Sequence, residues 1–251
     1  MTALARGLQV LKCFSPSSPE LGTAEIARMV KLPQPTAWRL CHTLLQMEFL
    51  TTVPGQDKLR LGLPVLGLGY TVLAADSITE TARPYMQTLA DRFQGTVSLA
   101  IREGLDMLYV QRVHGTAIVR SDLRIGSRLP LGYSASGWAY LAGITIERQR
   151  ELIAEIRAAS GSSWVKTEPK FRAAVKGYKK RGYIVNKGSY NGQINSVGVP
   201  VKSRDGAVRF ALTSGGIANI FDDERLKRAG NELRDLAIKL GNALPHANGH
   251  S

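Results

Sequence analysis

The first 60 residues contain three short helical patterns followed by a hairpin pattern, a succession that restricts this segment to very few folds. Apolar residues recur at helical spacing in Ala3–Phe14, in Ala24–Val30 and from Pro35 to about Met47. Two short strand patterns follow, Phe49–Val53 and Lys58–Leu61, around the turn residues Pro54–Asp57. Three helices closed by a β-hairpin are typical of a winged helix-turn-helix domain, to which we assign residues 1–62.

Local signals in this segment also predict how its helices begin and which side chains face the core. Thr23 is a suitable N-cap for the second helix. The expected inward residues of the first and third helices are Leu4, Leu8, Leu11 and Phe14, and Leu40, Thr43, Leu44 and Met47.

The rest of the chain predicts a second, larger domain. Residues 63–77 are interpreted as a linker helix, residues 78–245 as the second domain and residues 246–251 as a tail. The helical patterns are Ile78–Phe93, Tyr133–Ala142, Ile146–Ala158, Pro169–Arg181 and a helix from the capping residue Asp222 to Leu244. The strand patterns are Thr96–Ile101, Met107–Val110, Ile118–Ser121, Tyr183–Val185, Val197–Val201 and Val208–Thr213. Hairpins among these strands predict an α+β fold with a largely antiparallel sheet.

The third helical pattern carries side chains suited to reading DNA. A recognition helix enters the major groove with its N-terminal residues toward the base edges. Gln34, Thr36 and Arg39 offer hydrogen bonds to bases or phosphates, and Trp38 can pack on a sugar or a thymine methyl group. Lys58 and Arg60 are expected at backbone phosphates, and His42 either at a phosphate or simply on the surface of the helix. The alternative is a small helical domain that binds protein.

The charge of the chain favours polyanionic partners without locating a site. In 251 residues, 33 Lys and Arg oppose 20 Asp and Glu, a net charge of +13. Residues 1–75 contain seven basic and four acidic side chains, so most of the excess lies in residues 76–251. We interpret the densest basic stretch, Lys166–Lys187, as a solvated helix face. Binding of nucleic acid by this basic half, independent of base sequence, stays an alternative.

Signals of catalysis, metal binding and secretion are weak. Gly132–Ser136 begins like a nucleophile elbow, but Ser136 occupies the place of the second glycine. Gly67–Gly69 lacks the third glycine of a dinucleotide-binding loop. The histidines have no metal-ligand spacing with Cys13 and Cys41. No signal peptide is recognisable. We therefore expect a cytoplasmic protein without catalytic residues, cofactor, metal or membrane association. An enzyme whose first domain only mediates dimerisation stays an alternative.

Several fragments resemble the IclR family of bacterial transcription regulators, and their order and spacing are more specific than any single one. The fragments are Arg6–Leu11, Ala24–Ala27, Leu32–Leu40, Leu59–Gly62, Gly126–Leu131, Ala135–Ala142, Arg181–Tyr183 and Val197–Val201. The resemblance implies a winged helix-turn-helix domain, a linker helix and a GAF-like effector-binding domain. It also implies a homodimer or a dimer of dimers that binds double-stranded operator DNA and a small-molecule effector, and represses or activates transcription.

The resemblance further implies an effector pocket at a helix N-terminus and at three strand positions. Matched residue by residue, the pocket falls on Ala135, Ser136, Asn186, Ser196, Thr213 and Gly215, with apolar walls from Leu129, Tyr133 and Ile194. Three positions depart from the commoner family pattern. Asn186 replaces a frequent acid, Ser196 a frequent cysteine, and Gly215 a frequent hydroxyl residue.

The chemistry of these residues predicts a class of effector. Ser136, Ser196 and Thr213 are neutral donors, and Asn186 removes an acid. A helix N-terminus adds partial positive charge. We therefore expect a small organic or aromatic acid, or a polar hydroxylated metabolite, rather than a cation or a bulky lipid.

Overall fold

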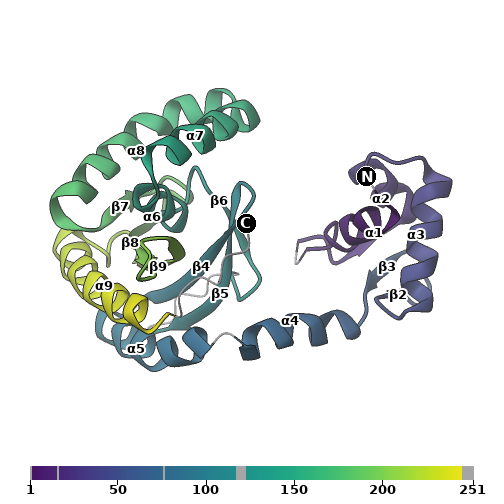
Figure 1. Cartoon of the computed structure of the whole chain (residues 1–251), viewed down its shortest axis with the longest axis horizontal. Helices are drawn as coiled ribbons and strands as arrows, with labels where there is room; N and C mark the ends of the chain where they lie inside the picture. Colours follow the sequence, from purple (N-terminus) through teal and green to yellow (C-terminus); the bar gives the residue numbers. More distant parts are fainter. Residues whose placement is uncertain (1, 16, 76, 117–122, 245–251) are drawn as a thin grey trace. The chain divides into compact units, whose positions relative to one another are not determined.

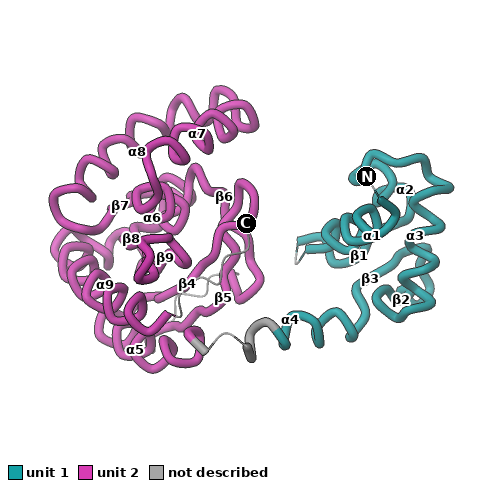
Figure 2. Tube along the Cα trace, in the orientation of Figure 1, with its two compact units in different colours: residues 1–76 teal, residues 77–251 magenta. Residues whose placement is uncertain are grey.

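The computed structural model describes residues 2–15, 17–75, 77–116 and 123–244, and it divides into two compact units (Figure 2). Unit 1 comprises residues 1–76 and unit 2 residues 77–251. Both units mix helices with antiparallel strands, so the predicted α+β class is confirmed (Figure 1). The predicted strand Ile118–Ser121 and the predicted tail, residues 246–251, lie outside the described residues.

Unit 1 has the predicted arrangement of helices closed by a hairpin. Its helices are α1 (Ala3–Leu11), α2 (Thr23–Met29), α3 (Gln34–Gln46) and α4 (Pro64–Ala75). Its strands are β1 (Glu20–Leu21), β2 (Leu50–Thr52) and β3 (Leu59–Leu61). The sequence patterns do not predict β1, which pairs with β3 and gives a three-stranded sheet in the order β1-β3-β2. This extra strand ties the connection between α1 and α2 to the wing.

The predicted inward face of α1 is wrong in its N-terminal half. Leu4 and Leu8 are 75% and 52% exposed, and Val10 is the fully buried residue of this helix. The reason is that α1 packs on α3 through its C-terminal part, where Val10 joins Ile26 and Cys41 in the core.

Two further expectations in unit 1 are corrected. In α3 the buried residues are Ala37 and Cys41, whereas Thr43 and Met47 are exposed. Thr23 is the first residue of α2 rather than its N-cap. Gly22 occupies the cap position, where its N–H donates to the Glu25 carboxylate at 2.8 Å.

Unit 2 is built on a six-stranded antiparallel sheet in the order β6-β5-β4-β9-β8-β7. The strands are β4 (Thr96–Glu103), β5 (Asp106–His114), β6 (Arg128–Pro130), β7 (Ile184–Lys187), β8 (Ile194–Lys202) and β9 (Val208–Ile217). One face packs against α5 (Ser77–Phe93) and α9 (Asp223–Ala243) (Figure 1). The other packs against α6 (Ala135–Gly143) and α8 (Ser162–Arg181), and α7 (Ile146–Ser160) packs on α8. The sheet therefore has a separate apolar core on each side.

Most predicted elements of unit 2 are confirmed, but β5, β8 and β9 extend beyond their predicted ranges because their strand pairing continues. Three further differences concern β6, α8 and α6. β6 is not predicted by the sequence patterns. α8 begins at Ser162 instead of Pro169, because fully buried Trp164 anchors an earlier turn and the helix tolerates an internal proline. α6 begins at Ala135 instead of Tyr133, because Tyr133 N and Ser134 N both donate to Pro130 O in a preceding turn.

Candidate effector cavity and DNA-binding face

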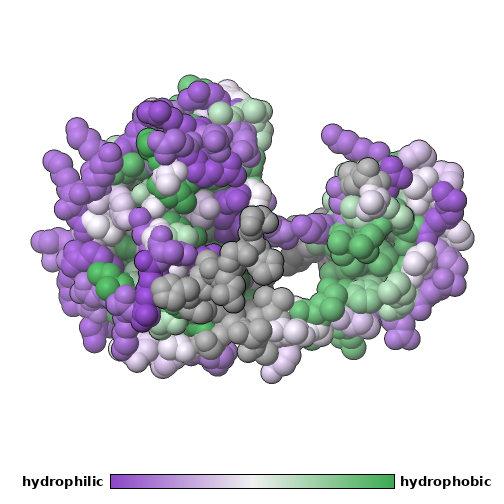
Figure 3. Space-filling view, in the orientation of Figure 1, coloured by the Kyte–Doolittle hydropathy of each residue, from purple (hydrophilic) through white to green (hydrophobic). Residues whose placement is uncertain are grey.

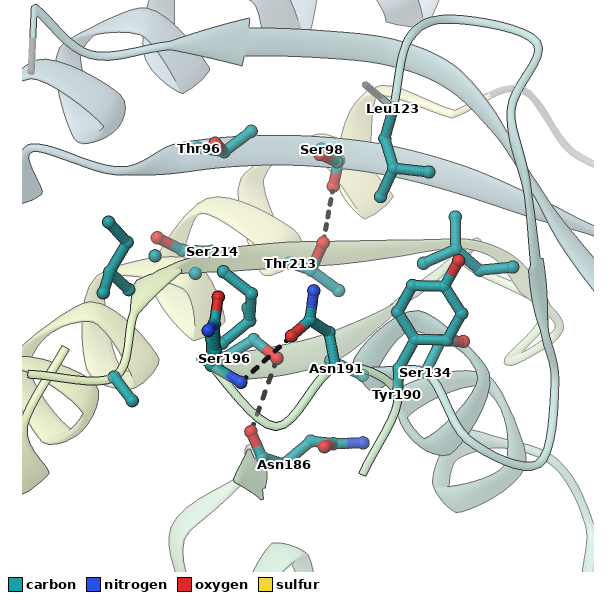
Figure 4. Close-up of a pocket in the computed structure, with 18 of the residues that line it drawn as sticks. Thr96, Ser98, Leu123, Ser134, Asn186, Tyr190, Asn191, Ser196, Thr213 and Ser214 are labelled. Atoms are coloured by element: carbon teal, nitrogen blue, oxygen red, sulfur yellow. Dashed lines mark hydrogen bonds between the residues drawn. The ribbon is translucent and has the colours of Figure 1, made fainter. Parts of the chain in front are cut away.

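The sheet face beneath α6 is hollowed into a cavity of about 820 Å³, which we call the sheet cavity. Two rows of paired residues that cross the strands form its floor (Figure 4). The first row consists of Arg112 on β5, Ser98 on β4 and Thr213 on β9. The second consists of Thr96 on β4, Gly215 on β9, Ser196 on β8 and Asn186 on β7. Because side chains alternate along a strand, positions two apart bring both rows to the same face.

The structure brings together most residues of the predicted effector pocket. Those that line the sheet cavity are Leu129, Ala135, Asn186, Ile194, Ser196, Thr213 and Gly215. Tyr133 and Ser136 are not part of the lining. The Tyr133 ring packs edge-on against Trp164, and the buried Ser136 hydroxyl lies 3.2 Å from Ser134 Oγ. The reason is the later start of α6, which presents Ser134 and Ala135 to the cavity in their place.

Asn186 joins β7 to the turn before α6. The side chain is 3% exposed, and both of its polar atoms are engaged. Its Nδ2 donates to Tyr133 O at 2.9 Å, and its Oδ1 accepts from Ser189 N at 3.1 Å. Asn186 therefore fixes the distance between the sheet and the start of α6, which is the height of the cavity.

The floor hydroxyls are held by neighbouring backbone carbonyls. Thr213 Oγ1 donates to Ser98 O at 3.4 Å, and Ser196 Oγ donates to Asn186 O at 3.5 Å (Figure 4). A hydroxyl that donates its proton keeps its lone pairs for other donors. This part of the floor is therefore polar and neutral.

Sequence reasoning missed the charged end of the cavity. Tyr109 and Arg112 both line it, although simple alternation would place residues three apart on opposite faces. β5 pairs Gln111 with Leu99 and Tyr109 with Ala100, which leaves Val110 as the extra residue of a β-bulge. The bulge turns Tyr109 and Arg112 to the same face. Their spacing in the sequence gives no signal of this.

Three features of the surroundings act on the Arg112 guanidinium. It lies over the Tyr109 ring, 5.1 Å from the ring centroid, and Nη1 donates to Ser98 Oγ at 2.9 Å. Burial lowers the pKa of Arg112, an effect that Tyr109 opposes, and the guanidinium stays protonated at neutral pH. Burial likewise raises the pKa of the Tyr109 hydroxyl, so this group stays neutral. Among the described residues that line the sheet cavity, Arg112 is the one charged side chain.

The N-terminus of α6 forms a second electropositive part of the lining. Ser134 is its N-cap, and Ser134 Oγ accepts from Gly137 N at 3.1 Å. The N–H groups earlier in the first turn have no acceptor within the helix. The cavity thus offers a full positive charge on β5 and a partial positive charge at the start of α6.

The exposed face of α3 carries most of the predicted DNA-contacting residues. Gln34, Trp38, Arg39 and His42 are exposed, whereas Thr36 is half-buried at the first turn. Trp38 is 53% exposed and stacks on His42, with 5.1 Å between the ring centroids. The two rings therefore form one aromatic surface on the exposed side of α3.

The wing places two cations beside α3 within unit 1. Lys58 and Arg60 are exposed, and Arg60 Nε donates to Thr51 Oγ1 at 3.3 Å, which holds the guanidinium against the sheet. The turn between β2 and β3 closes through a hydrogen bond from Val53 N to Lys58 O at 2.9 Å. Gly55 in this turn has a φ of +74°, which favours glycine.

Other chemistries find little support in the described part of the chain. Ser134 is engaged as a helix cap, and Gly67 and Gly69 lie inside α4 instead of in a phosphate-binding loop. Cys13 and Cys41 are buried and unpaired with each other, and burial raises the pKa of Cys41 to about 11. The described residues contain no group of three His, Cys, Asp or Glu suited to a metal ion. No described helix is long and apolar enough to cross a membrane.

The chain matches two sequence models of one protein family. The model described as "IclR helix-turn-helix domain" matches residues 3–54. The model described as "Bacterial transcriptional regulator IclR C-terminal" matches residues 70–242. The two matches have the order of the two structural units.

Individual relatives agree with these matches. The HTH-type transcriptional regulator TsaQ1/TsaQ2 of Comamonas testosteroni is 32% identical over 199 residues, which cover 78% of this chain and 71% of the relative. The crystal structure of an IclR family transcriptional regulator from Brucella abortus has a TM-score of 0.89 and 33% identity, covering 98% of this chain and 93% of the other.

A third relative shares the fold at lower identity. This IclR homolog from Microbacterium hydrocarbonoxydans, crystallised with 4-hydroxybenzoate, has a TM-score of 0.76 and 24% identity, covering 96% of this chain and 98% of the other. Because family matches to both units extend over most of the chain, the protein belongs to the IclR family of bacterial transcriptional regulators.

Proposed function

We propose that unit 1 binds operator DNA through α3 and the wing, and that a small organic acid bound in the sheet cavity controls the operator affinity. The observation that carries the effector class is the lining of the cavity, in which the described residues include one cation and no acid. We propose no enzymatic activity, and we place the site of action with the DNA, in the cytoplasm.

For DNA recognition, the exposed face of α3 supplies both base-reading and backbone-contacting groups. Gln34, Trp38 and His42 are four residues apart and share one stripe, with Arg39 beside it. We assign this stripe to the major groove, with Thr36 at its margin. Lys58 and Arg60 are assigned to backbone phosphates beside the groove.

For the effector, both electropositive parts of the sheet cavity favour a carboxylate. The relative that was crystallised with 4-hydroxybenzoate indicates one compound to test. Leu129 and Ile194 add apolar side chains to the lining, against which an aromatic ring can pack.

We further infer that the protein acts as a homodimer or a dimer of dimers. Figure 3 shows apolar surface on unit 1 among hydrophilic side chains. In α1 and α4 the exposed apolar residues include Leu4, Leu66 and Tyr70, which are 75%, 70% and 69% exposed. A second copy of the chain would cover such residues. Two copies would contact half-sites about one helical turn apart, or a multiple of it, in a near-palindromic operator.

Footprinting on DNA next to the protein's own gene, with and without benzoate and 4-hydroxybenzoate, tests this proposal. We expect a protected near-palindrome whose occupancy changes with an acid. Lys58→Ala should weaken binding to all sequences alike, because a phosphate contact carries no base information. The proposal fails if no sequence-specific site is protected under any condition.

A separate variant tests the alternative that the basic half of the chain binds nucleic acid independently of base sequence. Reversing the charge of Lys176, Lys179 and Lys180 on α8 removes much of the basic helix face. If this triple variant abolishes DNA binding while Arg39→Ala does not, binding belongs to the basic half of unit 2. If the triple variant binds its operator normally, this alternative is excluded.

A further inference from the structure

We propose that Arg112 determines the charge specificity of the sheet cavity by binding the carboxylate of the effector at the β4–β5 end, away from α6. This inference rests on the proposed function and adds which residue selects the acid and where its anionic group lies. The partial positive charge at the N-terminus of α6 offers the carboxylate a second place, so the two placements compete.

The geometry prepares Arg112 for a ligand. The β-bulge at Val110 is what turns the side chain into the cavity. Stacking on Tyr109 and the hydrogen bond to Ser98 restrict the guanidinium without neutralising it. A planar guanidinium held in one orientation suits bidentate binding of a carboxylate, because little side-chain entropy remains to be removed on binding.

The charge around Arg112 is uncompensated within the described structure. None of the ion pairs among described residues includes Arg112, and Nε lies buried without a hydrogen-bond partner. A buried donor of a charged group is costly to leave unsatisfied. An anion bound in the cavity beside Ser98 would compensate the charge of the guanidinium.

A purely structural arginine has a different environment in the same unit. Arg102 on β4 also lies over a tyrosine, 5.6 Å from the Tyr140 ring centroid. Its Nε donates to Tyr140 Oη at 3.2 Å, and its Nη1 donates to Gly104 O at 2.7 Å. Arg102 does not belong to the cavity lining. The two arginines differ in that Arg112 lines a cavity and keeps an unsatisfied donor.

The position of Arg112 also indicates the shape of the ligand. α6 lies mainly over β7, β8 and β9 and touches β4 and β5 less, whereas Arg112 is on β5. Adjacent strands are about 4.8 Å apart, so three strand steps separate β5 from β8 by about 14 Å across the sheet, and Arg112 and Ser196 also lie in different rows. The arginine side chain covers part of this distance. The remainder accommodates one ring or a short chain, with a neutral hydrogen-bonding group reaching Ser196 or Ser134.

Binding of matched pairs of acids and amides separates the effect of the ligand's charge from the effect of its shape. The 251-residue chain is titrated with benzoate, 4-hydroxybenzoate, phenylacetate and succinate, and with benzamide and 4-hydroxybenzamide, by thermal shift and calorimetry. We expect the wild type to bind at least one acid and to prefer it to its amide. Arg112→Gln should weaken acid binding on the order of 10- to 100-fold and leave amide binding within about threefold.

Two variants control for loss of folding. Arg112→Lys keeps the positive charge but lacks the paired N–H donors of the guanidinium, so it should retain part of the preference for acids over amides. Arg102→Gln removes the matched arginine outside the cavity and should bind acids like the wild type. The Tm of each variant without ligand shows whether the fold survives, and the comparison of acid with amide within one variant cancels any general loosening.

The outcomes distinguish this inference from the proposed function. If acids bind the wild type and Arg112→Gln equally well, Arg112 is not the counter-ion and the acid effector still stands. If the wild type binds amides as tightly as acids, charge selection by Arg112 is refuted. If no acid in the panel binds the wild type, the acid effector and the role of Arg112 both fail.

Discussion

Replacing Asn186 with aspartate introduces a carboxyl group where the sheet cavity depends on an amide. The Asn186 side chain is 3% exposed and bridges Tyr133 O and Ser189 N. An ionised carboxylate can still accept from Ser189 N, but it sets an acceptor against the Tyr133 carbonyl. Only the protonated acid can donate to Tyr133 O as the amide does.

This geometry determines how much Asn186→Asp lowers the free energy of unfolding and how that loss depends on pH. Removing the donor that satisfies a buried carbonyl costs about 1–3 kcal/mol. Because the folded state favours the protonated acid, the folded pKa of the new carboxyl lies above its unfolded value of about 3.9. Between those two values the folded state binds more protons, so the free energy of unfolding falls as pH rises. We expect a deficit of about 1–3 kcal/mol at pH 7.5 that shrinks toward pH 4.

Tryptophan fluorescence during urea unfolding measures this deficit in unit 2. Trp138 and Trp164 are both buried in unit 2, so a Trp38→Phe background removes the signal of unit 1. Asn242→Asp on exposed surface of α9 is the matched control and should change stability little at either pH. A deficit that is absent, or that stays the same at pH 5 and pH 7.5, would refute this account of Asn186.

Three other variants test separate parts of the structure. Arg39→Ala should weaken specific operator binding by about 1–3 kcal/mol for each base that the arginine reads, measured by gel shift against non-specific DNA, and unchanged binding would remove α3 from the interface. Gly241→Ala should lower the stability of unit 2 by about 1–3 kcal/mol, because a Cβ there overlaps the backbone carbonyl of Lys202, and an unchanged Tm would contradict the packing of α9 on β8. Hydrogen bonds from Arg157 and Arg172 hold the pKa of Glu168 below its ordinary value of 4.5. The stabilisation by these ion pairs is therefore present above that pH, and it is lost as pH falls through the lower pKa of the folded state. Glu168→Gln should therefore flatten the acid limb of Tm against pH, and parallel curves would show that the ion pairs contribute nothing.

Local patterns in the sequence were sufficient for the elements of unit 1 other than β1 and for most elements of unit 2. Helical periodicity, the capping residue Asp222 and the turn at Asp205-Gly206 act over a few residues, so neighbours in space are not needed to recognise them. The same reasoning failed for Leu4, Leu8, Thr43 and Met47. A helix has more than one apolar side, and the side that is buried depends on where its neighbours pack.

The residues of the sheet cavity also divide into those that could be placed from the sequence and those that could not. Resemblance to a family placed Asn186, Ser196, Thr213 and Gly215, because strand positions matched one by one keep their side of the sheet.

The positions of Arg112 and Tyr109 in the cavity lining could not be predicted from the sequence. Their common face exists because β5 gains one residue relative to β4 at Val110. A β-bulge is a property of two paired strands, and the alternation of a single strand assigns these residues to opposite sides. The sequence alone therefore determined which side chains the sheet carries, and strand pairing in the tertiary structure decided that a guanidinium enters the cavity.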